Sequence, residues 1–176
     1  MVSRLVLRRP RTEVRMIVCG IDPGPTDSAF VLWDGDKILE YGNTSNGDLL
    51  LRLEFPTRFN ALPDRCAIEQ IRGFGILASD GLFDTCHYTG RFLQAFGEDK
   101  TTMIPRKEVS RHICGSSGIS HDKFIREALI TRFGGKDIAI GKKKNVGPLY
   151  GIAGHTWAAL AVAITWWDLS EEMKEL

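Results

Sequence analysis

Three short apolar segments at the start of the chain, separated by tight turns, constrain the fold most strongly. Residues 16–21, 28–33 and 37–41 are rich in β-branched, aromatic and other apolar side chains, a composition that favours strands. The tetrapeptide DPGP at 22–25 and the tripeptide DGD at 34–36 separate them, and both are turn sequences. The opening of the chain is therefore predicted to be a three-stranded antiparallel meander.

The remainder of the chain is predicted to alternate strands and helices. Apolar patterning and turn signals predict strands over 65–71 and 101–104 and helices over 48–54, 83–97, 106–114, 120–133 and 155–169. The last helix is apolar almost all round and is expected to be buried, whereas residues 136–151 are expected to form a basic loop. This order predicts an α/β fold whose five-stranded mixed sheet, three antiparallel strands and then parallel strands, is flanked by helices.

The length of 176 residues is typical of one domain. We assign residues 16–176 to that domain and residues 1–15, which hold five arginines and one glutamate, to a flexible basic arm. The arm lacks the apolar core of a secretory signal but weakly resembles a transit peptide. We therefore expect a cytoplasmic protein, with an organelle as the alternative. No apolar run approaches the roughly 18 residues of a membrane span, so we expect no membrane partner.

The charge of the chain is balanced overall but unevenly distributed. The formal net charge is +1, and residues 106–145 carry a local charge of +6. This argues against a generic polyanion binder and for a local nucleic-acid surface, with an ordinary solvated face as the alternative. The candidate phosphate contacts in this range are Arg106, Lys107, Arg111, Lys123, Lys142, Lys143 and Lys144.

An aromatic residue in a loop and the four cysteines bear on ligand binding. Phe74 lies in a glycine-rich loop and could stack on a nucleic-acid base, or else pack in the core or against a second subunit. The four cysteines form no CxxC pair, which argues against a structural zinc site. Cys19 and Cys66 lie in apolar runs and are expected to be reduced, buried thiols.

Two carboxylates and one histidine are the candidate catalytic residues. Asp22 ends the first predicted strand and Glu69 interrupts a later apolar strand. If these strands are neighbours, the two carboxylates converge where α/β sheets place ligands, and such a pair suits Mg²⁺. His155 begins the buried last helix and could point toward Asp22. The ordinary alternatives are an Asx turn for Asp22, an outward edge position for Glu69 and a structural histidine.

The ordered set of these motifs resembles the RuvC-type Holliday junction resolvases of the RNase H-like superfamily. The set consists of GIDPG at 20–24 before a hairpin, IEQ at 68–70 and HTWAALAVA at 155–163. It covers about residues 16–168. The resemblance also places residues 106–114, the glycine-containing loop after them and Asp122-Lys123 near DNA phosphates.

The resemblance implies a homodimeric, metal-dependent endonuclease that cleaves four-way or other branched DNA junctions in recombination and repair. Asp22, Glu69 and His155 would hold the metal, Mg²⁺ or, because one ligand is an imidazole, Mn²⁺. The family carries a second ligand three residues further along the last helix, where this chain has Ala158. Asp168 lies too far along the helix to replace it. We expect the apolar face of residues 83–97, with Phe92 and Phe96, to form the dimer interface.

Three other functions remain open from the sequence. A junction-binding protein that no longer cuts would explain Ala158. An RNA-processing nuclease of the same superfamily would share the motifs, because recognition of a 2′-hydroxyl is not visible in them. A sugar-kinase or Hsp70-like ATPase also opens with a strand and a glycine-containing turn, but the chain is too short for its two domains.

Overall fold

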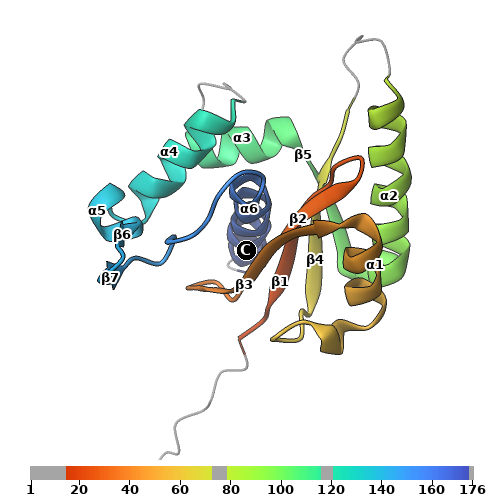
Figure 1. The fold of residues 1–176 in the computed structure, drawn as a ribbon, viewed down its shortest axis with the longest axis horizontal. Helices are drawn as coiled ribbons and strands as arrows, with labels where there is room; N and C mark the ends of the chain where they lie inside the picture. The colour runs from red at the N-terminus through yellow and green to blue at the C-terminus, as the bar shows by residue number, and fades with distance from the viewer. Residues whose placement is uncertain (1–14, 73–78, 116–120, 175–176) are drawn as a thin grey trace, which may run out of the picture.

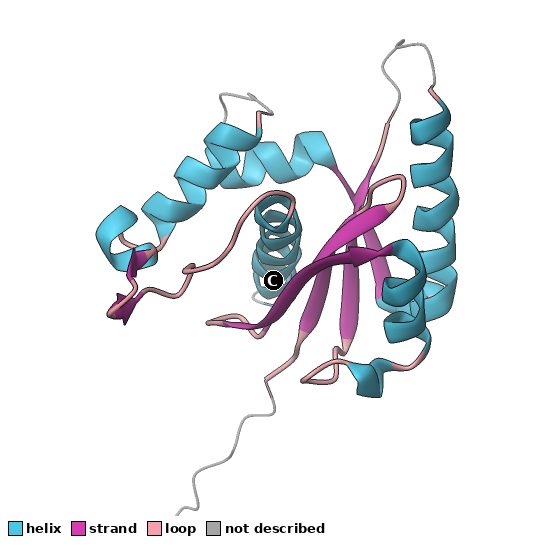
Figure 2. Ribbon diagram, in the orientation of Figure 1, coloured by secondary structure: helices cyan, strands magenta, loops and turns pink. Residues whose placement is uncertain are grey.

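The structure, a computed structural model, describes residues 15–72, 79–115 and 121–174. A five-stranded sheet crosses the molecule in the order β3-β2-β1-β4-β5 (Figures 1 and 2). Its strands are β1 (Val18–Asp22), β2 (Asp27–Trp33), β3 (Ile38–Ser45), β4 (Arg65–Gln70) and β5 (Thr101–Pro105). β1, β2 and β3 pair antiparallel, whereas β4 pairs parallel with both β1 and β5. The predicted mixed α/β sheet is confirmed.

Helices cover both faces of this sheet (Figure 1). One face carries α1 (Asn46–Glu54) and α2 (Asp80–Phe96), with the short 3-10 turns η1 (Pro56–Arg58) and η2 (Glu98–Lys100). The other face carries α6 (Thr156–Lys174), which α3 (Arg106–Cys114), α4 (Asp122–Arg132) and α5 (Lys136–Ala139) flank. A hairpin of β6 (Gly141–Lys142) and β7 (Asn145–Val146) follows α5.

The alternation of side chains along each strand divides the core into two layers. Cys19 and Ile21 of β1 pack with α1 and α2. Val18 of β1 and Ala67 of β4 pack instead with α6. Even-numbered residues of β1 and odd-numbered residues of β4 therefore face α6. The same alternation directs the side chains of Asp22 and Glu69 to the α6 side of the sheet.

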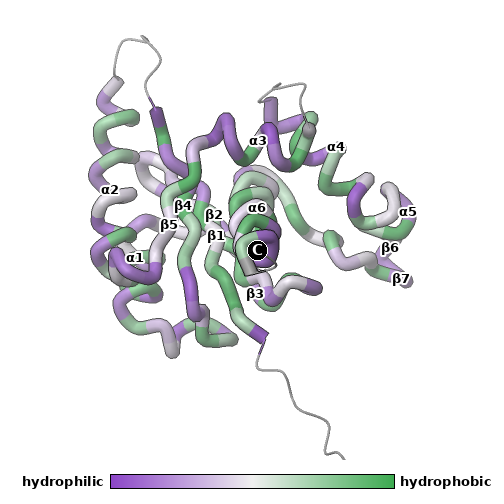
Figure 3. Tube along the Cα trace, turned by 180° about the vertical axis from the view of Figure 1, so that it is seen from behind, coloured by the Kyte–Doolittle hydropathy of each residue, from purple (hydrophilic) through white to green (hydrophobic). Residues whose placement is uncertain are grey.

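α6 lies unusually close to β1 because both surfaces are made of small residues. A Cβ atom at Gly20 would overlap the backbone oxygen of Ala159 and lie 2.7 Å from the Cβ of Ala163. Residues 157–165 of α6 are buried, and both α6 and the central strands are largely apolar in Figure 3. This contact sets where the N-terminal end of α6 meets the end of β1.

The structure corrects two expectations from the sequence. Residues 136–151 are not simply a loop, since they form α5 and the β6–β7 hairpin, which glycines at positive φ make possible, as at Gly135 and Gly141. The apolar face of α2 is not available to a second subunit, because Phe92 is fully buried between α2 and the sheet and Phe96 packs against the same core.

Cys19 and Cys66 are buried free thiols, as expected. None of the helices in the described part of the chain is long and apolar enough to cross a bilayer.

Gly20→Ala is predicted to destabilise the fold by about 1 to 3 kcal/mol, because the added methyl group meets the α6 backbone. Gly90→Ala is the matched control, since a Cβ there meets nothing within 4 Å in the middle of α2. That control should instead stabilise by about 0.5 to 1 kcal/mol. Chemical denaturation of both variants measures the difference, and equal stabilities would contradict the close packing of α6.

Candidate functional site

The candidate catalytic residues meet at the carboxyl ends of the three parallel strands. β1 and β4 pair in a register that places Ile21 beside Ile68, so Asp22 and Glu69 follow as the next residues of adjacent strands. Arg106 follows the end of β5, which pairs with β4 up to Gln70. β1 and β4 are neighbours, so the condition for Asp22 and Glu69 to converge is met. Parallel pairing is what brings these three side chains to one edge of the sheet.

His155 joins the site from the N-terminal end of α6. Gly154, with φ +52°, turns the chain into the helix just before it. The ring atom Nδ1 of His155 lies 3.0 Å from Oδ2 of Asp22. The His155 side chain is 73% exposed and that of Asp22 is 13% exposed. The pair therefore links an enclosed carboxylate to an imidazole in contact with solvent.

Arg106 bridges two further carboxylates. Its Nη1 donates to Oε1 of Glu69 over 2.9 Å, and the Glu69 side chain is only 7% exposed. Its Nη2 donates to Oδ1 of Asp122, the first residue of α4. The guanidinium thus supplies the charge and hydrogen bonds that a buried carboxylate needs.

The acidity of Asp22 reflects this crowding of negative charge. Burial raises its pKa to about 6, and the charge of Glu69 acts in the same direction. His155 and Arg106 oppose the shift only in part. For Arg106, burial lowers the pKa, but the charges and hydrogen bonds of Glu69 and Asp122 outweigh it and leave the pKa above the ordinary value. The pocket therefore favours added positive charge.

A cavity of ≈ 410 Å³ opens at this edge of the sheet. Asp22, Arg106, Asp122 and His155 line it together with the turn that follows β1 and with Asp27, Asn43, Ile71 and Thr85. Ala158 is buried with 7% exposure and is absent from this lining. Asp168 is engaged elsewhere, with Arg132 at 2.6 Å and His112 at 2.7 Å. Neither position on α6 adds a donor to the cavity.

The donor set suits a divalent cation, although these side chains are now paired with one another. Two carboxylates and an imidazole are ordinary ligands for Mg²⁺ or Mn²⁺. Asp22 is bonded to His155 and Glu69 to Arg106. In the described ranges, no three His, Cys, Asp or Glu side chains are grouped closely enough to hold an ion. Binding one therefore requires the carboxylates to exchange their present partners for it.

The other residues expected to contact nucleic acid lie in different places. Lys107 and Arg111 are exposed on α3, and Lys123 is exposed on α4 beside Asp122. Lys142, Lys143 and Lys144 are exposed on the β6–β7 hairpin, beyond the far end of α4 from Asp122 (Figure 1). The structure brings only Arg106 of this set to the cavity, and Phe74 lies outside the described residues.

Asp122 is the site residue that the sequence patterns did not single out. It begins a helix about 50 residues after Glu69, and an acidic residue in a first helical turn is ordinary. The only local signal was its place in the segment that the resemblance puts near DNA phosphates. Its contact with Arg106 is a product of tertiary packing.

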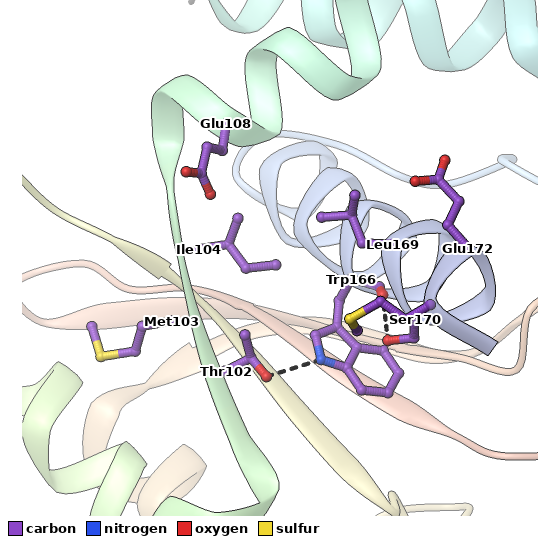
Figure 4. Close-up of a pocket in the computed structure, with 9 residues that line it drawn as sticks. Thr102, Met103, Ile104, Glu108, Trp166, Leu169, Ser170 and Glu172 are labelled. Carbon is purple, nitrogen blue, oxygen red and sulfur yellow. Dashed lines mark hydrogen bonds between the residues drawn. The ribbon is translucent and has the colours of Figure 1, made fainter. Parts of the chain in front are cut away.

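A second hollow is apolar and suits a different kind of contact. A groove of ≈ 390 Å³ lies between β5 and the C-terminal half of α6 (Figure 4). Trp166 Nε1 donates to Oγ1 of Thr102 across it over 3.0 Å, and Leu169 and Met173 line it. Its charged lining residues are Glu108 and Glu172. Without a cation this groove does not suit phosphate.

Comparison with solved structures identifies the fold. No protein-family model matches the chain, and no curated protein matches it. Among solved structures, RuvC of Thermus thermophilus is similar at 18% identity, with a TM-score of 0.64 over 89% of this chain and 96% of RuvC. The same RuvC in complex with a Holliday junction substrate has 19% identity and a TM-score of 0.65 over 89% of this chain and 96% of that one.

A viral resolvase shares the architecture more distantly. The fowlpox virus resolvase, in complex with substrate Holliday junction DNA, has 17% identity and a TM-score of 0.52 over 88% of this chain and 99% of that one. At these identities the similarity establishes the fold. The chain has the RNase H-like fold of the RuvC-type resolvases, as the motifs predicted.

Asp22→Asn is predicted to stabilise the metal-free protein above pH 6. The folded-state pKa of Asp22, about 6, exceeds its ordinary value of 3.8, so folding is penalised wherever the carboxylate must ionise. The gain should be absent near pH 4, grow up to pH 6 and stay constant above it, reaching at most about 3 kcal/mol. Denaturation in EDTA across this pH range measures it. A variant less stable than wild type at pH 7.5 would contradict the described environment of Asp22.

Proposed function

We propose that this chain is a metal-dependent, structure-selective endonuclease that hydrolyses phosphodiesters of four-way or other branched DNA junctions. The observation that carries the proposal is the meeting of Asp22, Glu69 and His155 at the carboxyl ends of β1 and β4 on an RNase H-like sheet. Two carboxylates on adjacent parallel strands, with an imidazole opposite, supply what metal-assisted hydrolysis requires. The solved structures of similar fold are described as complexes with Holliday junctions, which supports the choice of substrate.

The site residues would have different tasks: some would hold the metal ion, and one would accept a proton. Asp22 and Glu69 would hold Mg²⁺ or Mn²⁺, which when bound supplies an activated water and stabilises the leaving oxygen. His155, released from Asp22 by the cation, would complete the coordination or accept the proton of the attacking water. Arg106 would bind the phosphate beside the cleaved bond once its guanidinium leaves Glu69.

The surrounding cations would position the DNA. Lys107, Arg111 and Lys123 are exposed on the helices that begin nearest the cavity. The lysines of the β6–β7 hairpin would contact a more distant part of a branched substrate. Such contacts act through phosphates and fall steeply with salt.

We further propose that the chain works as a homodimer. A four-way junction needs two cuts for resolution and one small domain carries one site, so a two-fold dimer matches the symmetry of the substrate. The apolar face of α2 is excluded as the interface by the burial of Phe92. Light scattering at micromolar concentration with and without junction DNA tests the dimer, and a 19.7 kDa species in both cases would contradict it.

Asp22→Asn is predicted to lower cleavage of a labelled four-way junction by about 100-fold or more while leaving junction binding unchanged. The loss follows from removing a charged ligand at the reacting centre, and binding is preserved because the basic contacts are untouched. Asp80→Asn, an exposed acid at the start of α2, is the control and should cleave normally. Gel assays of cleavage in Mg²⁺ and Mn²⁺, with binding measured in Ca²⁺, give both quantities.

The same assay separates the other two functions. Binding without cleavage by the wild type in either metal would favour a junction-binding protein, the function that Ala158 suggests. Faster cleavage of an RNA or RNA–DNA substrate than of the DNA junction would favour an RNA-processing nuclease. Near-normal cleavage by the Asp22→Asn variant would overturn the proposed site.

A further inference from the structure

α4 brings a carboxylate, that of Asp122, to the cavity, and it has no role in the proposed function. Asp122 lines the same cavity as Asp22 and His155 and shares the guanidinium of Arg106 with Glu69. Glu69 and Asp122 thus share one arginine, and the charge of that arginine also acts on Asp22. α6 contributes His155 to the cavity but no carboxylate, because Ala158 and Asp168 do not reach it. A hard cation at this site would take its remaining oxygen ligand from elsewhere.

α4 holds Asp122 in a defined position relative to the N-terminal end of α6. Ile125 and Leu129 of α4 are buried in the core layer that contains α6. The guanidinium of Arg126 lies 5.4 Å from the ring centre of Trp157, in the first turn of α6. The start of α4 is therefore packed against the helix that carries His155. Although 74% exposed, the Asp122 side chain extends from a fixed backbone.

We infer that Asp122 is a metal-binding residue of this site, and this inference rests on the proposed function. Asp122 would supply the carboxylate that is missing from α6, where position 158 is an alanine. In the metal-free protein, Arg106 is ion-paired with both Glu69 and Asp122. Glu69 and Asp122 would hold a divalent cation in exchange for the guanidinium, and Arg106 would then be available to bind the phosphate of the substrate.

A variant of Asp27 controls for the general effect of removing a negative charge from the cavity. Both Asp27 and Asp122 are exposed acids that line it. Asp27 accepts a hydrogen bond from its neighbour Thr26, whereas Asp122 pairs with Arg106. Loss of either removes the same charge, but only Asp122 is placed to share an ion with Glu69. Asp27→Asn is therefore the matched control.

The test is Mn²⁺ binding by the full-length protein without DNA, measured by calorimetry. Asp122→Asn should weaken Mn²⁺ affinity by about tenfold or more, equivalent to about 1.4 kcal/mol, while Asp27→Asn leaves it unchanged. Asp22→Asn should abolish binding. Equal affinities of wild type and Asp122→Asn, with binding lost in Asp22→Asn, would overturn the inference and leave the proposed function standing. No Mn²⁺ binding by the wild type would overturn both.

A double-mutant cycle with Arg106 separates a ligand from a residue that acts through its partner. If Asp122 only positions Arg106, its substitution has no effect on Mn²⁺ affinity in an Arg106→Gln background. If Asp122 binds the ion, the loss of affinity persists in that background. Persistence supports the inference, and disappearance overturns it. Because Asp122 is exposed, its substitution should leave the fold intact, and thermal melts of each variant check this.

Discussion

The contact between α6 and β1 is the interaction on which the site depends. Gly20 allows the backbone of α6 at Ala159 to lie directly on the central strand, and the side chains of α6 are buried along the contact. The hydrophobic effect drives this burial, and close packing makes the geometry unique. Because Asp22 ends the strand and His155 precedes the helix, the distance between them follows from that packing. The geometry of the proposed site is thus set by small residues that carry no functional groups.

The adjacent carboxylates of the site destabilise the folded state, and the ion pairs of Arg106 reduce that destabilisation. Parallel pairing of β1 and β4 forces Asp22 and Glu69 together in a poorly solvated place, and the pKa of Asp22 rises to about 6 as a result. Arg106 compensates Glu69 and Asp122 but leaves the cavity with more acids than cations. Such unrelieved charge is expected where a cation belongs to the working state of the protein. A bound cation would explain why two poorly solvated carboxylates lie side by side at this edge of the sheet.

The sequence predicts those parts of this molecule that local patterns determine. The meander and the strand over 65–71 follow from apolar runs and turns. Whether the strands of Asp22 and Glu69 are neighbours stayed open in the sequence, because the order of strands in a sheet depends on tertiary pairing. The β6–β7 hairpin could not be predicted, because its strands are only two residues long and the segment depends on glycines at positive φ. The face of α2 was misassigned because its amphipathic pattern does not say whether Phe92 meets the sheet or a partner. Asp122 could not be found because packing between α4 and α6, including Arg126 on Trp157, brings it to the site.

The central claim is that the carboxyl ends of β1 and β4 form a divalent cation site. Crystals grown with Mn²⁺ and measured at the manganese absorption edge test it most directly. The account predicts an anomalous peak within bonding distance of the carboxylates of Asp22 and Glu69, with Arg106 withdrawn from Glu69. A peak elsewhere on the protein, with the Glu69–Arg106 ion pair intact, would contradict it.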